Sequence, residues 1–214
     1  MKITILRKKR NDDRSFLQTY EYAPSVPGET AATALKAINR LYPDDPVSWD
    51  CGCLQKKCGS CAMVINGRPG LACAFKLSNV KKELKLEPLR KFHVVEDLII
   101  DRSILQNDLI QAEEWLDETA VMTEKKQDIL FEASRCLQCG CCLEVCPNYM
   151  PDGIFYGMAA AVPLIRLINE SNGEDRKHHR KIYGKHIYNG CGKSLSCRNI
   201  CPAGIDIDRL LVHR

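Results

Sequence analysis

The sequence predicts an α+β protein in which a small mixed-sheet domain precedes an all-α domain. Short segments of the first hundred residues alternate apolar and polar side chains, as strands do. From about Asp101 the apolar residues recur at helical spacing. The thirteen cysteines fall into three groups, at residues 51–73, 136–146 and 191–201. We therefore expect one domain over residues 1–100 and a second over residues 101–214.

The first domain is expected to combine several strands with one helix. Lys2–Leu6 alternates, and Leu17–Tyr22 is strand-like. Glu29–Leu41 places apolar residues at helical spacing, which predicts a helix. Met63–Leu71 contains Asn-Gly, the dipeptide typical of a tight hairpin turn. These segments predict a small mixed sheet beside a cysteine-rich loop.

The second domain is expected to consist of helices between cysteine groups. Apolar residues at helical spacing from Ile104 to Leu116 predict a helix, and a polar connector, Asp117–Gln127, follows it. The longest apolar run is Gly157–Ile165, about half the length that a bilayer-spanning helix needs. We therefore expect no transmembrane segment in this chain.

The cysteine content restricts the class of protein. Thirteen cysteines in 214 residues suit either disulfides in a secreted chain or metal ligands in a reducing compartment. The N-terminus, MKITILRKKR, lacks the apolar core and cleavage site of a signal peptide, which favours metal ligands. A net charge of +4 does not indicate nucleic-acid binding, and the sequence contains no nucleotide-binding glycine motif.

The first cysteine group, WDCGCLQKKCGSCAMVINGRPGLAC, predicts a 2Fe–2S site. Cys53, Cys58 and Cys61 have the C-x4-C-x2-C spacing of plant-type clusters, and Cys73 is the more distant fourth ligand. Cys51 falls outside this register, so we expect it not to be a ligand. Zinc is the alternative metal, but zinc sites usually pair two short cysteine knuckles, and Cys73 stands alone.

The residues between these ligands are expected to compensate the negative charge of a cluster. Backbone N–H groups of short loops supply such compensation, and Gly52 and Gly59 permit tight turns. Lys56 and Lys57 either add positive charge near the cluster or are ordinary solvated residues.

The second and third cysteine groups share one frame. Arg135–Pro147, RCLQCGCCLEVCP, contains the C-x2-C-x2-C-x3-C-P run of cubane-type clusters, whose fourth cysteine serves the other cluster of a pair. Gly190–Pro202, GCGKSLSCRNICP, repeats this spacing with Ser194 at one ligand position. Exchanging the fourth cysteines predicts two unequal sites. They are a 4Fe–4S site of Cys136, Cys139, Cys142 and Cys201 and a 3Fe–4S site of Cys146, Cys191 and Cys197.

These three sites use every cysteine except Cys51 and Cys141. We expect both remaining cysteines to be small, buried, apolar residues. Three clusters in one chain predict a conduit that carries electrons between two other partners.

The order and spacing of the cysteines resemble the iron–sulfur subunit of the succinate dehydrogenase/fumarate reductase family. The matching segments are C-x4-CGSCAM-x-INGRP-x-LAC at Cys53–Cys73, the run Cys136–Pro147, and C-x5-C-x3-CP at Cys191–Pro202. Pro88–Asp101, PLRKFHVVEDLIID, is similar to the interdomain segment of the family. The resemblance implies a β-grasp 2Fe–2S ferredoxin-like domain followed by an all-α helical ferredoxin domain.

The resemblance also implies cofactors and partners. A flavoprotein subunit would interconvert succinate and fumarate on FAD, and the 2Fe–2S cluster would face that flavin. The 3Fe–4S cluster would face a membrane-anchor subunit and a quinone. The chain would then be an oxidoreductase subunit, peripheral on the cytoplasmic face of the membrane, with a role in the tricarboxylic acid cycle.

The chain departs from the family near the expected quinone site. After Cys146 the family often places a serine and then a tryptophan, whereas Asn148–Pro151 follows here. Gly192 stands where quinone-linked members commonly have histidine. Tyr149 is a candidate quinone contact, and the alternative is a partly buried aromatic residue beside the cluster.

Two other functions stay open, and these departures motivate the first of them. One is the iron–sulfur subunit of a soluble flavin-dependent reductase that acts on another unsaturated acid, and the other is a stand-alone ferredoxin-like carrier. The basic segment Glu174–His186 is expected to be a solvated helix face. Contact of this segment with anionic lipid headgroups or an acidic partner is the alternative.

Overall fold

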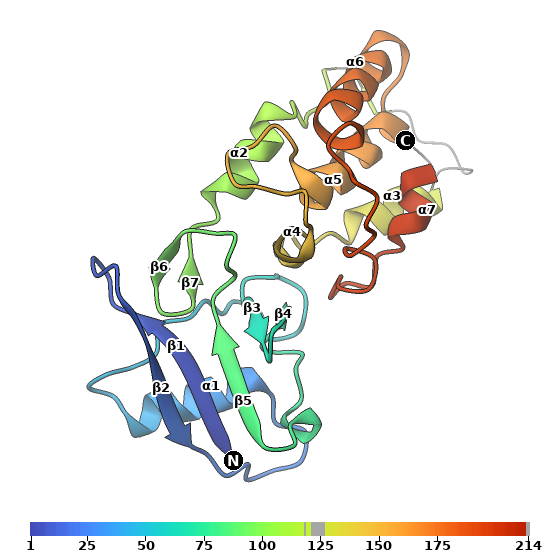
Figure 1. Cartoon of the computed structure of the whole chain (residues 1–214). Coiled ribbons are helices and arrows are strands. Elements are labelled where there is room, and N and C mark those ends of the chain that lie inside the picture. The colour runs from blue at the N-terminus through green and yellow to red at the C-terminus, as the bar shows by residue number, and fades with distance from the viewer. Residues whose placement is uncertain (118, 121–126, 213–214) are drawn as a thin grey trace. The chain divides into compact units, whose positions relative to one another are not determined.

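The computed structural model describes residues 1–117, 119–120 and 127–212. The chain divides into two compact units, Met1–Asp101 and Arg102–Arg214 (Figure 1). The first unit combines a five-stranded sheet with a helix, and the second is helical. The α+β fold class predicted from the sequence is therefore confirmed.

The sheet of the first unit has the strand order β2-β1-β5-β3-β4. β1 pairs antiparallel with β2 and parallel with β5, and β3 pairs antiparallel with β4 and β5. A separate two-stranded sheet contains β6 and β7. The strands are β1 (Lys2–Lys8), β2 (Ser15–Glu21), β3 (Ala62–Ile65), β4 (Arg68–Leu71), β5 (Glu83–Glu87), β6 (Val94–Glu96) and β7 (Ile99–Ile100).

The sequence predicts β1, β2 and the β3–β4 hairpin, but not β5, β6 or β7. The hairpin turn has the predicted chemistry, because Asn66 and Gly67 both have positive φ, 49° and 79°. The Asn66 side chain also accepts a hydrogen bond from the Lys85 N–H at 2.7 Å. The turn is thereby attached to β5, next to the pairing of Val64 and Ile65 of β3 with the same strand.

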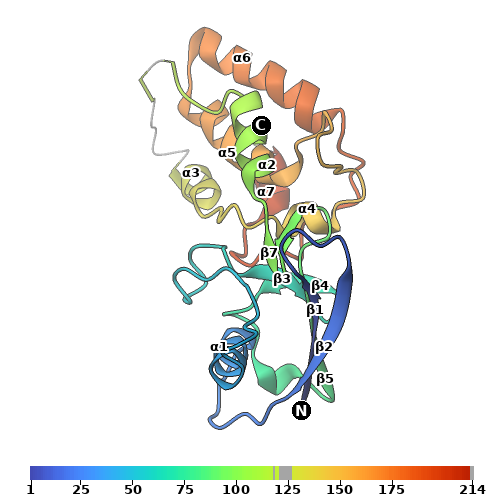
Figure 2. The ribbon, with the colours of Figure 1, turned by 90° about the vertical axis from the view of Figure 1, so that its left-hand side faces the viewer.

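Helix α1 (Ala31–Leu41) lies against one face of the sheet (Figure 2). It starts at Thr30, whose side chain accepts from the Thr33 N–H while the Thr33 side chain accepts from the Thr30 N–H. A short 3-10 helix, η1 (Leu77–Asn79), follows the hairpin. The fully buried side chains of α1, β1 and β5 include Ala34, Leu35, Ile38, Ile3, Ile5, Leu84 and Leu86.

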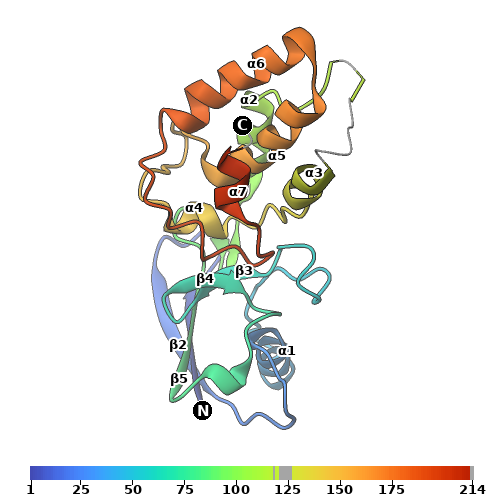
Figure 3. The same ribbon diagram turned by 90° about the vertical axis from the view of Figure 1, so that its right-hand side faces the viewer.

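The second unit is built around α5, which contacts α2, α3, α4, α6 and α7 (Figure 3). Its elements are α2 (Ser103–Gln111), α3 (Gln127–Ser134), α4 (Cys141–Val145), α5 (Gly157–Glu170), α6 (Gly173–Tyr183), the π-helix η3 (Gly184–Tyr188) and α7 (Ile207–Val212). Among the described residues, no helix combines the length and the apolar character needed to cross a membrane.

Helix α2 is shorter than the sequence predicts. The predicted helix runs to Leu116, whereas α2 ends at Gln111. Glu113 has a φ of 49°, and a left-handed residue cannot continue a right-handed helix. Residues 118 and 121–126 of the predicted connector Asp117–Gln127 lie outside the described residues.

A buried arginine, Arg7, links several segments of the first unit by hydrogen bonds. The Arg7 side chain is 0% exposed and donates to both oxygens of Asp97, from Nε to Oδ1 at 3.1 Å and from Nη2 to Oδ2 at 2.8 Å. Asp97 also accepts from the backbone N–H groups of Lys8 and Ser48, at 3.1 and 2.9 Å. Further Arg7 bonds reach Gln18, Tyr20, Asp45 and Pro46. The network joins β1 to the β6–β7 turn and to the segment that leads into the first cysteine group.

We expect Asp97→Asn to lower the free energy of unfolding by about 3–5 kcal/mol, because the buried Arg7 charge loses its counter-charge. Asparagine accepts the positive φ of 47° at this position, so backbone strain is not the cause. Urea unfolding of the full chain measures the change. Arg14→Ala, which removes an exposed pair with Asp12, is the control and should have no measurable effect. Equal stability of the two variants would contradict the assigned role of Asp97.

Candidate metal centres

The first cysteine group forms a loop whose backbone N–H groups donate to sulfur. Gln55 N and Lys57 N donate to Cys53 Sγ at 3.2 and 3.3 Å. Cys53 N donates to Cys58 Sγ at 3.3 Å. Such bonds stabilise thiolates and the negative charge of a cluster that they bind. The loop therefore supplies the compensation that the sequence predicts.

Left-handed residues give this loop its shape. Leu54, Lys56 and Gly59 have φ values of 54°, 61° and 75°. Alternation of left-handed and other conformations turns successive N–H groups toward one concave side, which binds anions. Gly52 has a different role, since a Cβ there would lie 3.2 Å from Cys58 Sγ and crowd that sulfur.

Ser60 contributes to the same loop and was not singled out by the sequence. Its hydroxyl accepts from the Gly52 N–H at 3.0 Å and is hydrogen-bonded to Cys58 Sγ at 3.2 Å. The Cys53 N–H and the Ser60 group together lower the pKa of the Cys58 thiol to about 6. The available sequence signal is the serine between two ligand positions.

The β3–β4 hairpin brings the other two predicted ligands together. Cys61 directly precedes β3 and Cys73 follows β4, and the Ala72 N–H donates to Cys61 O at 3.0 Å. Both cysteines are buried, and burial raises the pKa of the Cys61 thiol to about 12. Metal binding at these positions therefore releases protons.

Cys51 differs from its sequence-based expectation. We expect a small buried residue, but Cys51 is exposed. The residues around it belong to no strand or helix and lie on the surface of the loop. Cys141 is fully buried as expected, but it is more than an apolar side chain. Its thiol hydrogen-bonds the Cys139 sulfur and lowers the pKa of Cys139 to about 7.

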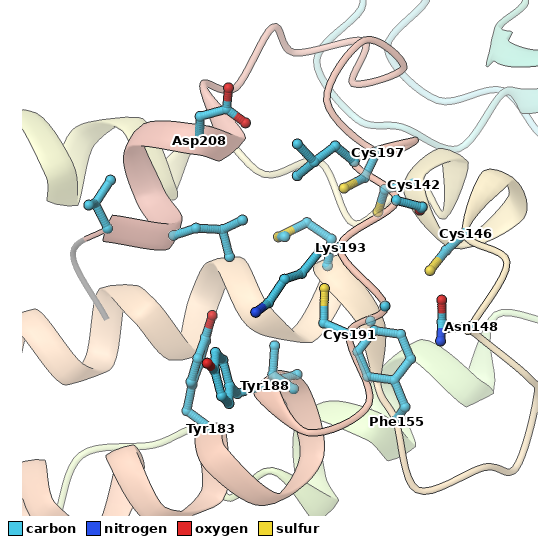
Figure 4. Close-up of a pocket in the computed structure, with 18 residues that line it drawn as sticks. Cys142, Cys146, Asn148, Phe155, Tyr183, Tyr188, Cys191, Lys193, Cys197 and Asp208 are labelled. Atoms are coloured by element: carbon cyan, nitrogen blue, oxygen red, sulfur yellow. The ribbon is translucent and has the colours of Figure 1, made fainter.

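The second and third cysteine groups line two cavities. A cavity of about 30 Å³ is lined by Cys136, Cys139, Cys142 and Cys201 among others. A larger cavity of about 410 Å³ is lined by Cys142, Cys146, Cys191 and Cys197 among others (Figure 4). Cys201 thus joins the second group and Cys146 joins the third. Burial raises the pKa of the Cys136 and Cys197 thiols to about 11.

The larger cavity is wider than a single ion requires. Among residues 1–117, 119–120 and 127–212, no three His, Cys, Asp or Glu side chains are placed to hold one metal ion. The several cysteine sulfur atoms that line each cavity are the donors that iron–sulfur clusters use.

The backbone conformation of the second cysteine group recurs at the equivalent positions of the third. Gln138 and Gly140, on either side of Cys139, have φ values of 49° and 82°. Lys193 and Leu195, on either side of Ser194, have φ values of 55° and 54°. The two loops therefore match in conformation as well as spacing, and Ser194 occupies the place of Cys139. The Ser194 hydroxyl accepts from Ser196 Oγ at 3.3 Å.

Two departures from the family lie in contact with each other. A Cβ at Gly192 would lie 2.5 Å from Asn148 Oδ1 and 3.0 Å from Asn148 Nδ2. Both residues line the larger cavity, and Figure 4 shows Asn148 near Cys146. A side chain at position 192 would displace the Asn148 amide from its present place, so Gly192 leaves room for that amide.

Tyr149 points into the protein. It is 1% exposed, and its hydroxyl donates to Asp108 Oδ2 at 3.4 Å. Burial raises the pKa of the Asp108 carboxyl to about 6. Its placement matches an aromatic residue packed beside the cysteine groups, and a quinone contact at Tyr149 stays a prediction.

Comparison with known families agrees with two of the three predicted kinds of site, the 2Fe–2S and the 4Fe–4S site. Residues 2–107 match a family described as a 2Fe-2S iron-sulfur cluster binding domain. Residues 132–205 match a family described as a 4Fe-4S dicluster domain. The first match covers the loop of Cys53–Cys73, and the second covers the cysteines of the helical unit.

Individual relatives match over nearly the whole chain. The succinate dehydrogenase iron-sulfur subunit of Bacillus subtilis (strain 168) is 31% identical, over 97% of this chain and 88% of the relative. The fumarate reductase iron-sulfur subunit of Wolinella succinogenes is 29% identical, over 90% of this chain and 84% of the relative. A solved structure, the Mycobacterium smegmatis Sdh1 complex in the apo form, has a chain with a TM-score of 0.80. That match covers 99% of this chain and 92% of the other at 22% identity, and it shows a shared fold.

We expect Cys51→Ser to keep the visible absorption and the electron paramagnetic resonance signal of a 2Fe–2S cluster. Cys53→Ser should disturb both, because Cys53 Sγ accepts two backbone N–H bonds in the loop and lies in the ligand register. The two serine variants make the same chemical change two residues apart, so each controls for the other. Loss of the cluster in Cys51→Ser would show that the assigned register is wrong.

Proposed function

The chain belongs to the succinate dehydrogenase/fumarate reductase family of iron–sulfur subunits, and on that premise we propose an electron path through it. The path connects FAD on a flavoprotein subunit with a quinone at a membrane-anchor subunit. The chain itself is the electron-transfer subunit of an oxidoreductase and performs no chemistry on the organic substrate. When bound, its three clusters supply centres that each take up and release one electron.

The main support for the proposal is that Cys201 and Cys146 each lie with the cysteine group to which they do not belong in sequence. Cys201 lines the cavity of the second cysteine group, and Cys146 lines the cavity of the third. This is the exchange expected of paired clusters. We assign Cys53, Cys58, Cys61 and Cys73 to the 2Fe–2S site, Cys136, Cys139, Cys142 and Cys201 to the 4Fe–4S site, and Cys146, Cys191 and Cys197 to the 3Fe–4S site.

Ser194 is the reason for assigning a 3Fe–4S cluster to the third cysteine group and a 4Fe–4S cluster to the second. It has the position and flanking conformation of Cys139, but a hydroxyl in place of a thiol. A thiol has a pKa of about 8.5, whereas an aliphatic hydroxyl is far harder to deprotonate. Ser194 therefore holds a fourth iron poorly, and a 3Fe–4S cluster is favoured there.

We place the two partners by the exposed basic residues of the chain. Lys56 and Lys57 are exposed on the first ligand loop, which suits a surface for the flavoprotein. Helix α6 exposes Lys177, Arg180 and Lys181, which suits peripheral contact with the anionic cytoplasmic face of a membrane. Tyr149, although buried, remains the candidate contact on the quinone side.

A second function is favoured by one observation. The Asn148–Gly192 contact replaces the serine and histidine expected near a quinone. This suits a soluble flavin-dependent reductase of another unsaturated acid, with no quinone. Purification of the native complex separates the proposals. A flavoprotein with a helical anchor supports the first, a flavoprotein alone supports the second, and neither would indicate a stand-alone carrier.

We expect Ser194→Cys to convert the 3Fe–4S centre into a second 4Fe–4S centre, because the fourth thiolate becomes available. In the oxidised wild-type protein, electron paramagnetic resonance should show a 3Fe–4S signal. That signal should fade in the variant, and a second reduced 4Fe–4S signal should appear. Ser196→Cys, two residues away and outside the ligand frame, should leave the wild-type signals. Two 4Fe–4S clusters in the wild type would refute the assignment.

Charge reversal at the first ligand loop tests the flavoprotein surface. Lys56→Glu with Lys57→Glu should slow electron transfer from reduced flavin to the 2Fe–2S centre in stopped-flow measurements on the complex, and added salt should weaken the effect. Lys81→Glu with Lys82→Glu makes the same charge change at another exposed pair of this unit and is the control. Equal rates in both double variants would make Lys56 and Lys57 ordinary solvated residues.

A further inference from the structure

A proline inside α5 leaves a carbonyl without its helical partner. Pro163 has no N–H, so the carbonyl of Ala159, four residues earlier, receives no hydrogen bond from it. Ala159 is 4% exposed, so water does not readily supply a substitute. A buried carbonyl in this position needs another donor.

Gln138 supplies that donor from the second cysteine loop. Its Nε2 donates to Ala159 O at 2.8 Å. The same Nε2 donates to Cys136 Sγ at 3.3 Å. A side-chain amide nitrogen carries two hydrogens, so both bonds form together. Gln138 thus links the unpaired helical carbonyl to a sulfur atom of the four-cysteine cavity.

The orientation of the Gln138 amide follows from its partners. A carbonyl oxygen only accepts hydrogen bonds, and a metal-bound thiolate also only accepts. The nitrogen must therefore face both atoms, which removes the usual ambiguity between the two ends of the amide. Gln138 and Ala159 both line the cavity with Cys136, so the amide lies at the wall of the site.

We propose that Gln138 tunes the reduction potential of the four-cysteine centre and that Pro163 holds it in position by leaving Ala159 O free for it. An N–H donor to a ligand sulfur stabilises the reduced, more negative state of a cluster and raises its potential. Gln138 acts through Cys136 and is a positioning residue. The inference rests on the proposed assignment of Cys136 as a ligand.

The matching residue in the third group is oriented differently. Lys193 has the same place in the frame and the same left-handed backbone as Gln138. Its ammonium lies 5.3 Å from the centre of the Tyr188 ring, and Figure 4 shows the side chain extending toward Tyr183 and Tyr188. The repeat therefore places an amide on sulfur in one loop and an ammonium over an aromatic ring in the other. The two centres receive different electrostatic environments from equivalent positions.

Redox titration of the whole complex, followed by electron paramagnetic resonance, tests the role of Gln138. Gln138→Leu should lower the equilibrium constant for reducing the 4Fe–4S centre by roughly fivefold to tenfold, as expected for the loss of one hydrogen bond. A tenfold change corresponds to about 59 mV for one electron. Gln138→Glu removes the donor and adds negative charge, so its decrease should be at least as large. Gln111→Leu, at an exposed glutamine of α2, is the control and should cause no shift.

Pro163→Ala tests the positioning. It restores a helical N–H to Ala159 O, which loosens the Gln138 amide and should lower the equilibrium constant by a smaller factor, about twofold to threefold. In the Gln138→Leu background the same change should have no further effect, because the two residues act through one bond. If Pro163→Ala still shifts the potential in the Gln138→Leu background, the link between Pro163 and Gln138 is refuted. It is also refuted if Pro163→Ala shifts the potential in neither the wild-type nor the Gln138→Leu background.

The outcomes separate this inference from the ligand assignment. If Cys136→Ser leaves the 4Fe–4S signal and its potential intact, Cys136 is not a ligand and the proposed site fails. If that variant loses the signal but Gln138→Leu and Gln138→Glu keep the wild-type potential, the ligand set stands and the role of Gln138 is refuted. The potential of the three-cysteine centre should stay constant in all Gln138 variants, which excludes a general loss of structure.

Discussion

Hydrogen bonds from N–H groups to cysteine sulfur are the interaction on which the rest of the structure depends. A cluster held by thiolates concentrates negative charge, and a protein must offset that charge where the thiolates meet. The three cysteine loops of the chain share one backbone design. In each loop two left-handed residues alternate with other conformations, at Leu54 and Lys56, at Gln138 and Gly140, and at Lys193 and Leu195. Left-handed backbone is costly for residues other than glycine, so the folded units must hold these loops in shape.

Each unit provides this support in its own way. In the first, the Arg7–Asp97 network fixes residues 45–48 against β1, and the hairpin fixes Cys61 and Cys73. In the second, α5 is the element that the other helices contact, and its Ala159 carbonyl receives the Gln138 side chain. Arg102 also donates to Cys139 O at 3.1 Å. The loops are therefore extensions of well-packed elements.

The sequence predicts the fold class and the grouping of cysteines because both depend on local spacing. The C-x4-C-x2-C and C-x2-C-x2-C-x3-C-P patterns and the Asn66-Gly67 turn fall in this class. Features that depend on contacts between distant residues were not predicted. The β5 pairing, the surface position of Cys51, the Gly192–Asn148 contact and the Pro163–Gln138 link each join residues from separate segments, or reflect how a loop packs. No spacing rule identifies Gln138 as a functional residue, because its proposed role depends on Pro163, which lies twenty-five residues later in the sequence.

The crossed cysteines have a consequence for how the helical unit assembles. In the proposed ligand sets, each centre joins the second cysteine group to the third, and the segment between Cys146 and Cys191 lies between the two groups. An inserted cluster then closes a loop around α5 and α6, much as a cross-link does, and restricts the chain before the helices have finished packing. Because both closures span the same segment, forming one shortens the search for the other. On these ligand sets we expect iron–sulfur insertion and folding of this unit to be coupled, so that iron supply would influence how much of the subunit is folded.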